Sequence, residues 1–481
     1  MRTKIALAVV LLVGTAHSPA WAAATAEEAA RLTASFQAYL SDTPGVVAVA
    51  PEGTEYVVKI DFSPLLAKVA GNGFSATIAP FQFHITDLGE GKWKYREDQP
   101  YAMSLTVPGA VEAKLVVDRV TADGVYDATN MGFEFFLAEF SNMAVDELVT
   151  NPNGQINVNY DIASWKMEYA ATPVADGIVD GKYTSTLTDI SEEISMPLMP
   201  GQPSMPFKVK MANGSQSGAF AGLRTRALTE LLAWFVAHPS EDMIKANQKE
   251  LKAVLASALP LWDSMTGTST LDGLASETPV GPVSIATIGF DADMSGFSRN
   301  GKFREKLAFT GIAPPPGIVP PWAEGLIPHA FSIDFTLSDF DLATPAQLAL
   351  DNLDLNREPP VSPEVEPQLL ASLLPKGAVT LSLSASEIVS KLAAISYEGT
   401  FTFGPAAAPM AKAVIRMKGM DEVIAALNAA PPEMGVGQMM PMVLMAKGLA
   451  KVEADGSLSW LIESTDGVSV TVNGVDPTKM Q

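Results

Sequence analysis

Residues 154–170 read GQINVNYDIASWKMEYA, and the alternation in this stretch decides the fold class. Its first half places an apolar side chain at every second position: Ile156, Val158, Tyr160 and Ile162, separated by Asn157, Asn159 and Asp161. Successive side chains of a β-strand point to opposite faces, so this segment has one buried face and one hydrated face. Two-faced strands of this kind are typical of antiparallel sheet.

The same period of two extends over most of the chain. It recurs upstream at Tyr56, Val58 and Ile60, and downstream at Phe331, Ile333 and Phe335, where polar residues fill the intervening positions. The C-terminal end repeats it on both sides of a turn at Asp466-Gly467, with Leu458, Trp460 and Ile462 before the turn and Val468, Val470 and Val472 after it. This ending predicts a β-hairpin.

Helical periodicity occurs in a few places only. Residues 25–40 carry apolar side chains on one side of a predicted helix, and residues 221–265 contain two apolar stripes separated by His238-Pro239. Ser240 can cap the second of these helices, so the segment predicts a helical hairpin. Short helices are also expected at residues 364–374, 386–394, 421–429 and 439–451.

These patterns predict an α+β protein with a predominantly antiparallel, twisted β-sheet, a central helical hairpin and several short helices. The expected parts are a signal peptide at 1–22, an N-terminal β-rich region at 25–215, the helical hairpin at 221–265, and a C-terminal β-rich region with short helices at 270–481. Whether the two β regions form one domain or two is left open by the sequence.

The N-terminus has the three parts of a secretory signal peptide. Arg2 and Lys4 precede an apolar run at 5–13, and Ala20-Trp21-Ala22 supplies the small residues at which cleavage is expected, after Ala22. No later segment offers the roughly 18 uninterrupted apolar residues of a membrane span. The chain has 0 Cys, which excludes disulfides and thiolate sites. The expected location is the bacterial periplasm, with no transmembrane span after cleavage.

The balance of charge limits the classes of partner. There are 54 acidic and 32 basic residues, for a net charge of -22. This field repels nucleic acid and anionic lipid headgroups, so neither is an expected partner. Acidity also serves solubility.

Motifs for catalysis, metal binding and cofactors are missing from the sequence. His84, His238 and His329 lie far apart, and no Gly-x-Ser-x-Gly or phosphate-binding loop occurs. The chain is therefore expected to be noncatalytic, with no cofactor, no metal and no catalytic residue. A hydrolase that uses carboxylates together with His84 stays open as an alternative, because acidic residues are plentiful.

Methionine is the residue type with unusual usage, at 21 in all. The candidate apolar binding surface consists of Met434, Met439, Met440, Met442 and Met445. Flexible thioether side chains suit an adaptable surface for a lipid or a protein partner. Two alternatives are ordinary core filling and, since thioethers are soft ligands, copper(I) binding.

The C-terminal motif Gly456-x-Leu458-x-Trp460, followed by the Val468–Val472 alternation and Asn473-Gly474, supports a family resemblance. It is similar to the ending of the exported bacterial family called domain of unknown function 2125, and more remotely to family 945. The resemblance implies no catalytic residues. Together these features favour a noncatalytic periplasmic protein that binds a lipid or acyl chain or supports cell-envelope assembly, with an envelope protein as a further candidate partner. A structural, partner-binding scaffold is the remaining alternative.

Overall fold

The computed structural model describes residues 23–69, 75–151, 154–197, 204–278, 280–405, 407–464, 467 and 469–477. The predicted signal peptide at 1–22 lies outside these ranges. The chain divides into two units. Unit 1 runs up to Asp263 and includes Leu350–Val361, whereas unit 2 consists of Ser264–Ala349 and the chain from Ser362 onward.

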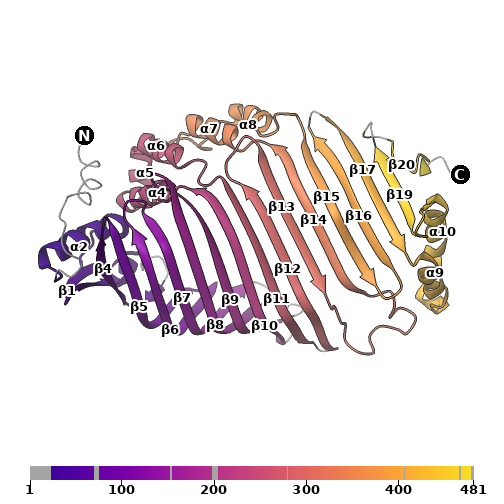
Figure 1. Cartoon of the computed structure of the whole chain (residues 1–481), viewed down its shortest axis with the longest axis horizontal. Coiled ribbons are helices and arrows are strands. Elements are labelled where there is room, and N and C mark those ends of the chain that lie inside the picture. Colours follow the sequence, from indigo (N-terminus) through magenta and orange to yellow (C-terminus); the bar gives the residue numbers. More distant parts are fainter. Residues whose placement is uncertain are drawn as a thin grey trace. The chain divides into compact units, whose positions relative to one another are not determined.

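Unit 1 is built on antiparallel strands that pair in chain order from β4 to β10, with β2 beside β4, β1 beside β2, and β3 beside β5 (Figure 1). Their bounds are β1 (Val47–Glu52), β2 (Glu55–Ile60), β3 (Ser75–Ile78), β4 (Phe81–Gly89), β5 (Lys92–Val107), β6 (Val111–Asp127), β7 (Gly132–Asn151), β8 (Gly154–Ala175), β9 (Ile178–Pro197) and β10 (Ser204–Leu223).

Unit 2 repeats this plan, because its strands pair in chain order from β11 to β17 and continue through β19, which also pairs with β18 and β20. Their bounds are β11 (Ser264–Thr278), β12 (Gly281–Ser295), β13 (Gly301–Thr310), β14 (Pro328–Phe340), β15 (Val379–Ser390), β16 (Ala394–Gly404), β17 (Ala407–Lys418), β18 (Lys451–Val452), β19 (Leu458–Ser464) and β20 (Thr471–Val472). In the predicted C-terminal hairpin, Ile462 of β19 pairs with Val472 of β20, which is limited to Thr471–Val472, whereas Asp466 and Val468 lie outside the described residues.

The helices are short and lie between strands. They are α2 (Ala26–Leu40), α3 (Ser63–Val69), α4 (Thr225–Ala237), α5 (Glu241–Ala246), α6 (Gln248–Ala258), α7 (Ala343–Asn352), α8 (Glu366–Leu373), α9 (Met420–Asn428) and α10 (Met440–Leu449), with 3-10 turns η2 (Pro363–Val365), η3 (Pro432–Met434) and η4 (Val436–Met439). The predicted helix at 25–40 is confirmed, and the Thr25 side chain caps it by accepting from the backbone N–H of Glu28.

The prediction of an α+β fold with a central helical hairpin is wrong. Strands hold 56% of the residues and helices 23%, so the protein is a mostly β, antiparallel structure with a few helices. The share of strand is this high because the strands are long: β8 alone has 22 residues, several times the usual strand length of about 5 to 6 residues.

Two local corrections go with this one. Residues 221–265 form three helices, because Asn247 ends α5 and donates its side-chain amide to the Met243 carbonyl oxygen at 2.8 Å. The helix expected at 386–394 is instead strand, in which Ile388 pairs with Ile395 across the β15–β16 hairpin. Alternating Ser and apolar residues fit that strand, since the buried Ser386 hydroxyl accepts from the Asp334 backbone N–H at 3.0 Å.

The core of unit 1 lies where α2 packs on β2, β4 and β5. Ala29 and Leu32 of α2 are buried against Val58, Phe83 and other side chains of these strands. Phe36 of α2 meets Phe83 edge to face, with ring centroids 5.9 Å apart. Helix α2 therefore covers one end of one face of the sheet.

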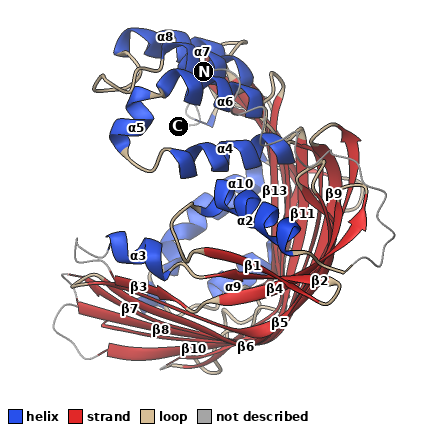
Figure 2. Cartoon of the chain, turned by 90° about the vertical axis from the view of Figure 1, so that its left-hand side faces the viewer, coloured by secondary structure: helices blue, strands red, loops and turns tan. Residues whose placement is uncertain are grey.

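Strands β6 to β10 each contain a residue that is left out of the ladder pairing, and these residues form a row across the sheet. We call this row the bend line; it consists of Asp118, Asn142, Ala163, Asp189 and Ala212. Asn142 and Asp189 have φ of 51° and 50°, a left-handed conformation that Asn and Asp tolerate better than most residues. The residues opposite each other are both left unpaired, so the register is the same on the two sides of the row. Figure 2 shows the strands of unit 1 curving around the side on which α2 lies.

Candidate apolar binding faces

The strands of unit 2 collect their apolar side chains on one face of the sheet. Residues directly opposite each other in an antiparallel ladder point to the same face. The ladder places Phe303 beside Met294 and Leu337, and it continues through further partners. The apolar face of unit 2 comprises Phe290, Met294, Phe303, Leu307, Phe309, Phe331, Ile333, Phe335, Leu337, Leu381, Phe401, Phe403 and Ile415.

This face is incompletely covered. Among the described residues of unit 2, the fully buried apolar side chains are Val365, Ala378, Met420 and Trp460, and none of them lies in β11–β17. Phe290 is 38% exposed and Phe403 45% exposed, although both belong to a continuous apolar surface. Large contiguous apolar patches on a protein surface mark interaction sites.

The apolar face of unit 1 is better covered. One of its rows runs through Tyr101, Val117, Met143, Ile162, Ile190 and Met211, of which Val117, Ile162 and Ile190 are almost fully buried. The rows nearer the β5–β6 turn are more open, since Met103 is 42% exposed. The same face carries Trp93 of the core beneath α2, so it is the inner face of the curved sheet (Figure 2).

Polar groups on the inner face of unit 1 are bonded to one another. The Tyr95 hydroxyl donates to buried Glu97 at 2.6 Å, and Gln99 also donates to that carboxylate. Burial, followed by the bond to Glu97, raises the pKa of Tyr95 far above its usual range. Trp165 donates from Nε1 to Ser185 Oγ at 2.7 Å. Because these groups satisfy each other, they do not offer a polar site for a substrate.

The opposite faces of both sheets are polar. In unit 2, Arg304 binds Asp334 through two bonds of 3.0 and 2.7 Å. In unit 1, Arg119 binds Asp98 through two bonds of 2.7 Å each, and this holds the pKa of the Asp98 carboxyl below its usual value. The outer faces therefore carry ion pairs, which are exposed at Arg119–Asp98 and largely buried at Arg304–Asp334.

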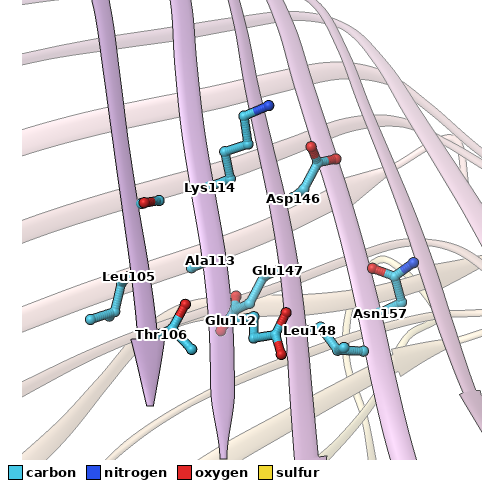
Figure 3. Close-up of a pocket in the computed structure, with 10 residues that line it drawn as sticks. Leu105, Thr106, Glu112, Ala113, Lys114, Asp146, Glu147, Leu148 and Asn157 are labelled. Carbon is cyan, nitrogen blue, oxygen red and sulfur yellow. The ribbon is translucent and has the colours of Figure 1, made fainter. Parts of the chain in front are cut away.

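A hollow of about 280 Å³ lies on unit 1 across β5 to β8. Figure 3 shows Lys114 and Asp146 at one end and Glu112 and Asn157 farther along the strands. It is open to solvent, and the residues that line it include no histidine. Its lining includes the carboxylates of Glu112, Asp146 and Glu147 and the ammonium group of Lys114.

His84 and His238 of unit 1 have different surroundings. His84 lies near Glu55, with Nδ1 3.3 Å from the carboxylate, and Arg96 contacts the same carboxylate at 2.8 Å. His238 stacks on Trp234 at the end of α4, with ring centroids 4.1 Å apart. Within the described ranges, no three His, Cys, Asp or Glu residues come together as metal ligands. From the sequence, His84 is a candidate general base in a carboxylate hydrolase. In the structure, His84 lies beside the ion pair between Glu55 and Arg96.

The predicted methionine surface lies on η3, η4 and α10 of unit 2. Met434, Met439, Met442 and Met445 are 53, 51, 59 and 49% exposed, and Met440 is half-buried. Four of the five methionines are therefore exposed to solvent. All five lie on helical segments and not on the apolar faces of the sheets. The candidate binding surface inferred from the sequence consists of these methionines and includes none of the residues on the apolar faces of the sheets.

Comparisons with protein-family models, curated proteins and solved structures found no match to this chain. The resemblance to domain of unknown function 2125 therefore stays a prediction. Within the described residues, no helix combines the length and apolar character needed to span a bilayer.

Proposed function

We propose that this protein is a noncatalytic periplasmic binder of acyl chains, which lie on the apolar face of unit 2. The observation that carries the proposal is the exposure of Phe290 and Phe403 on a face that continues across β12 to β17. The predicted signal peptide supports the periplasmic location.

The chemistry of the face favours an acyl chain over an extended polypeptide. The backbone N–H and C=O groups of β12 to β16 are used in the ladders on both sides of each strand. An extended polypeptide laid on such a face would leave its own backbone groups unpaired, which costs free energy. An acyl chain has no such groups.

The dimensions and energies are also suitable. Neighbouring strands lie about 4.8 Å apart, so an acyl chain of about 15 Å, half the hydrocarbon thickness of a bilayer, crosses roughly three to four strands. Each buried CH₂ contributes about 0.8 kcal/mol, so about ten buried groups give the free energy of a micromolar complex.

Titration with a fluorescent fatty acid tests the proposal. The wild-type protein should bind it at roughly micromolar concentration, and Phe290→Glu should weaken binding about tenfold or more, because a carboxylate replaces apolar surface. Met410→Glu is the matched control, since Met410 is 49% exposed and pairs with Thr402 on the polar face of the same sheet. Equal affinity in all three proteins, or no binding by the wild type, would contradict the proposal.

A further inference from the structure

A charged residue, Glu305 of β13, lies on the apolar face of unit 2. Its ladder partners are Ala292 on β12 and Phe335 on β14, so the three side chains point to the same face. Along its own strand, Phe303 and Leu307 are the next residues on that face. None of these four neighbours has a polar side-chain group, and Glu305 is only half-buried among them. The carboxylate is therefore open to a ligand that lies on the face.

The basic side chains of these strands lie on the opposite face. In the described parts of β12 to β17, the basic residues alternate with those of the apolar face and so point away from it; they are Lys302, Arg304, Lys306, Lys412, Arg416 and Lys418. Some of them already have acidic partners there, since Lys302 donates to Asp293 at 2.6 Å and Arg304 binds Asp334. These strands thus supply no cation to Glu305.

An acyl chain that covers this face would take water away from the Glu305 carboxylate. A carboxylate that loses its hydration without gaining a partner raises the free energy of the complex. Because the strands offer no cation on this face, the partner has to come from the ligand. An ammonium group supplies it with N–H donors, and charge-assisted bonds of this kind are stronger than neutral ones. The net charge of -22 also favours a cationic ligand over an anionic one.

We propose that Glu305 binds the ammonium group of a cationic lipid whose acyl chain lies across β14 to β16. The inference rests on the proposed function, since it requires an acyl chain on this face. Strands β13 and β16 are three strand spacings apart, about 14 Å, which matches an acyl chain of about 15 Å (Figure 1). From Glu305 the chain passes over Phe335 and Leu383 toward β16. The other direction leads over Ala292 and Gly267, which present less apolar surface.

Competition with the fluorescent fatty acid tests the inference. The competitors are tetradecylammonium, uncharged tetradecanol and tetradecanoate, which share one chain length. At pH 7 the wild-type protein should bind tetradecylammonium about tenfold more tightly than tetradecanol, because only the ammonium group pairs with the carboxylate, and it should bind tetradecanoate least tightly. Glu305→Gln should reduce the difference between the amine and the alcohol to about twofold or less, and it should bind tetradecanoate more tightly than the wild type does.

Glu387→Gln is the matched control, since Glu387 of β15 is exposed on the polar face of the same sheet, opposite Ser396. It removes the same charge and should keep the wild-type preference, which separates the effect of Glu305 from that of net charge. Equal binding of the amine and the alcohol by the wild type, a preference that persists in Glu305→Gln, or one that is lost in Glu387→Gln overturns this inference and leaves acyl-chain binding standing. Failure of the wild type to bind any of the chains overturns the proposed function, and this inference with it.

Discussion

Units 1 and 2 present the same two-faced antiparallel ladder, yet they cover its apolar face to different extents. In unit 1, α2 buries Val58, Phe83 and Trp93, and the central row through Ile162 and Ile190 is closed off. In unit 2, the equivalent positions of β11–β17 stay partly exposed. An identical sequence period is thus enclosed in the core of one unit and leaves a partly exposed apolar surface in the other.

Removing an aromatic ring from each face should give the largest contrast. Phe83→Ala is expected to destabilise unit 1 by about 3–5 kcal/mol, because Phe83 is 7% exposed and contacts Phe36 and Tyr95. Phe403→Ala should cost unit 2 about 1 kcal/mol, since nearly half of that ring is already exposed. Urea denaturation followed by hydrogen exchange along the chain separates the units. If the two substitutions lowered the free energy of unfolding by similar amounts, the apolar faces of the two units would not differ in how well they are covered.

Alkaline pH should affect unit 1 more than unit 2. Burial raises the pKa of Tyr126 to about 12, and it also raises the pKa of Tyr95 and Tyr101. An unfolded tyrosine ionises near pH 10, so the folded state keeps a proton that the unfolded state loses, and stability falls as pH rises from about 10 to about 12. For Tyr126 the loss is about 2 kcal/mol.

Unit 2 provides the internal control for this prediction, because Tyr397 is its single tyrosine in the sequence. Thermal unfolding between pH 8 and pH 11 should show unit 1 losing stability first. Substitution Tyr126→Phe should remove part of the pH dependence. A parallel decline of both units would show that buried tyrosines are not its source.

The smallest expected effect concerns the bend line. Asn142→Ala should destabilise unit 1 by about 1–2 kcal/mol, because Asn tolerates the left-handed conformation better than Ala does. It also removes the 3.0 Å bond from the Asn142 amide to Asp118. Asn142→Gly should cost less, since glycine accepts this conformation. The two variants are compared by urea unfolding, and equal losses would mean that the backbone conformation is not what matters.

Sequence periodicity was sufficient for the antiparallel strands and for α2. It overestimated helix at 386–394, where Ser386 and Ile388 fit a strand as well as a helix and the partner strand decides. The extent of the sheet could not be predicted, because the pattern within one strand does not state how many neighbours it has.

The bend line, by contrast, leaves a signal in the sequence. Along β8 the apolar positions run 156, 158, 160 and 162 and then resume at 165, 167 and 169, a step of three. A similar step occurs in β7 between Phe140 and Met143. The exposure of the unit 2 face leaves no such signal in the sequence. Phe290, which is partly exposed in unit 2, and Phe83, which is buried in unit 1, both belong to a strand of alternating apolar residues. Whether a helix covers them depends on the tertiary fold.

The bend line is one residue wide and lies in register across neighbouring strands. The direction in which the sheet of unit 1 turns is therefore independent of the length of its strands. Lengthening the hairpin arms by pairs of residues would preserve the inward orientation of each side chain and would enlarge the space beneath the fold. The conformations of Asn142 and Asp189 would not have to change.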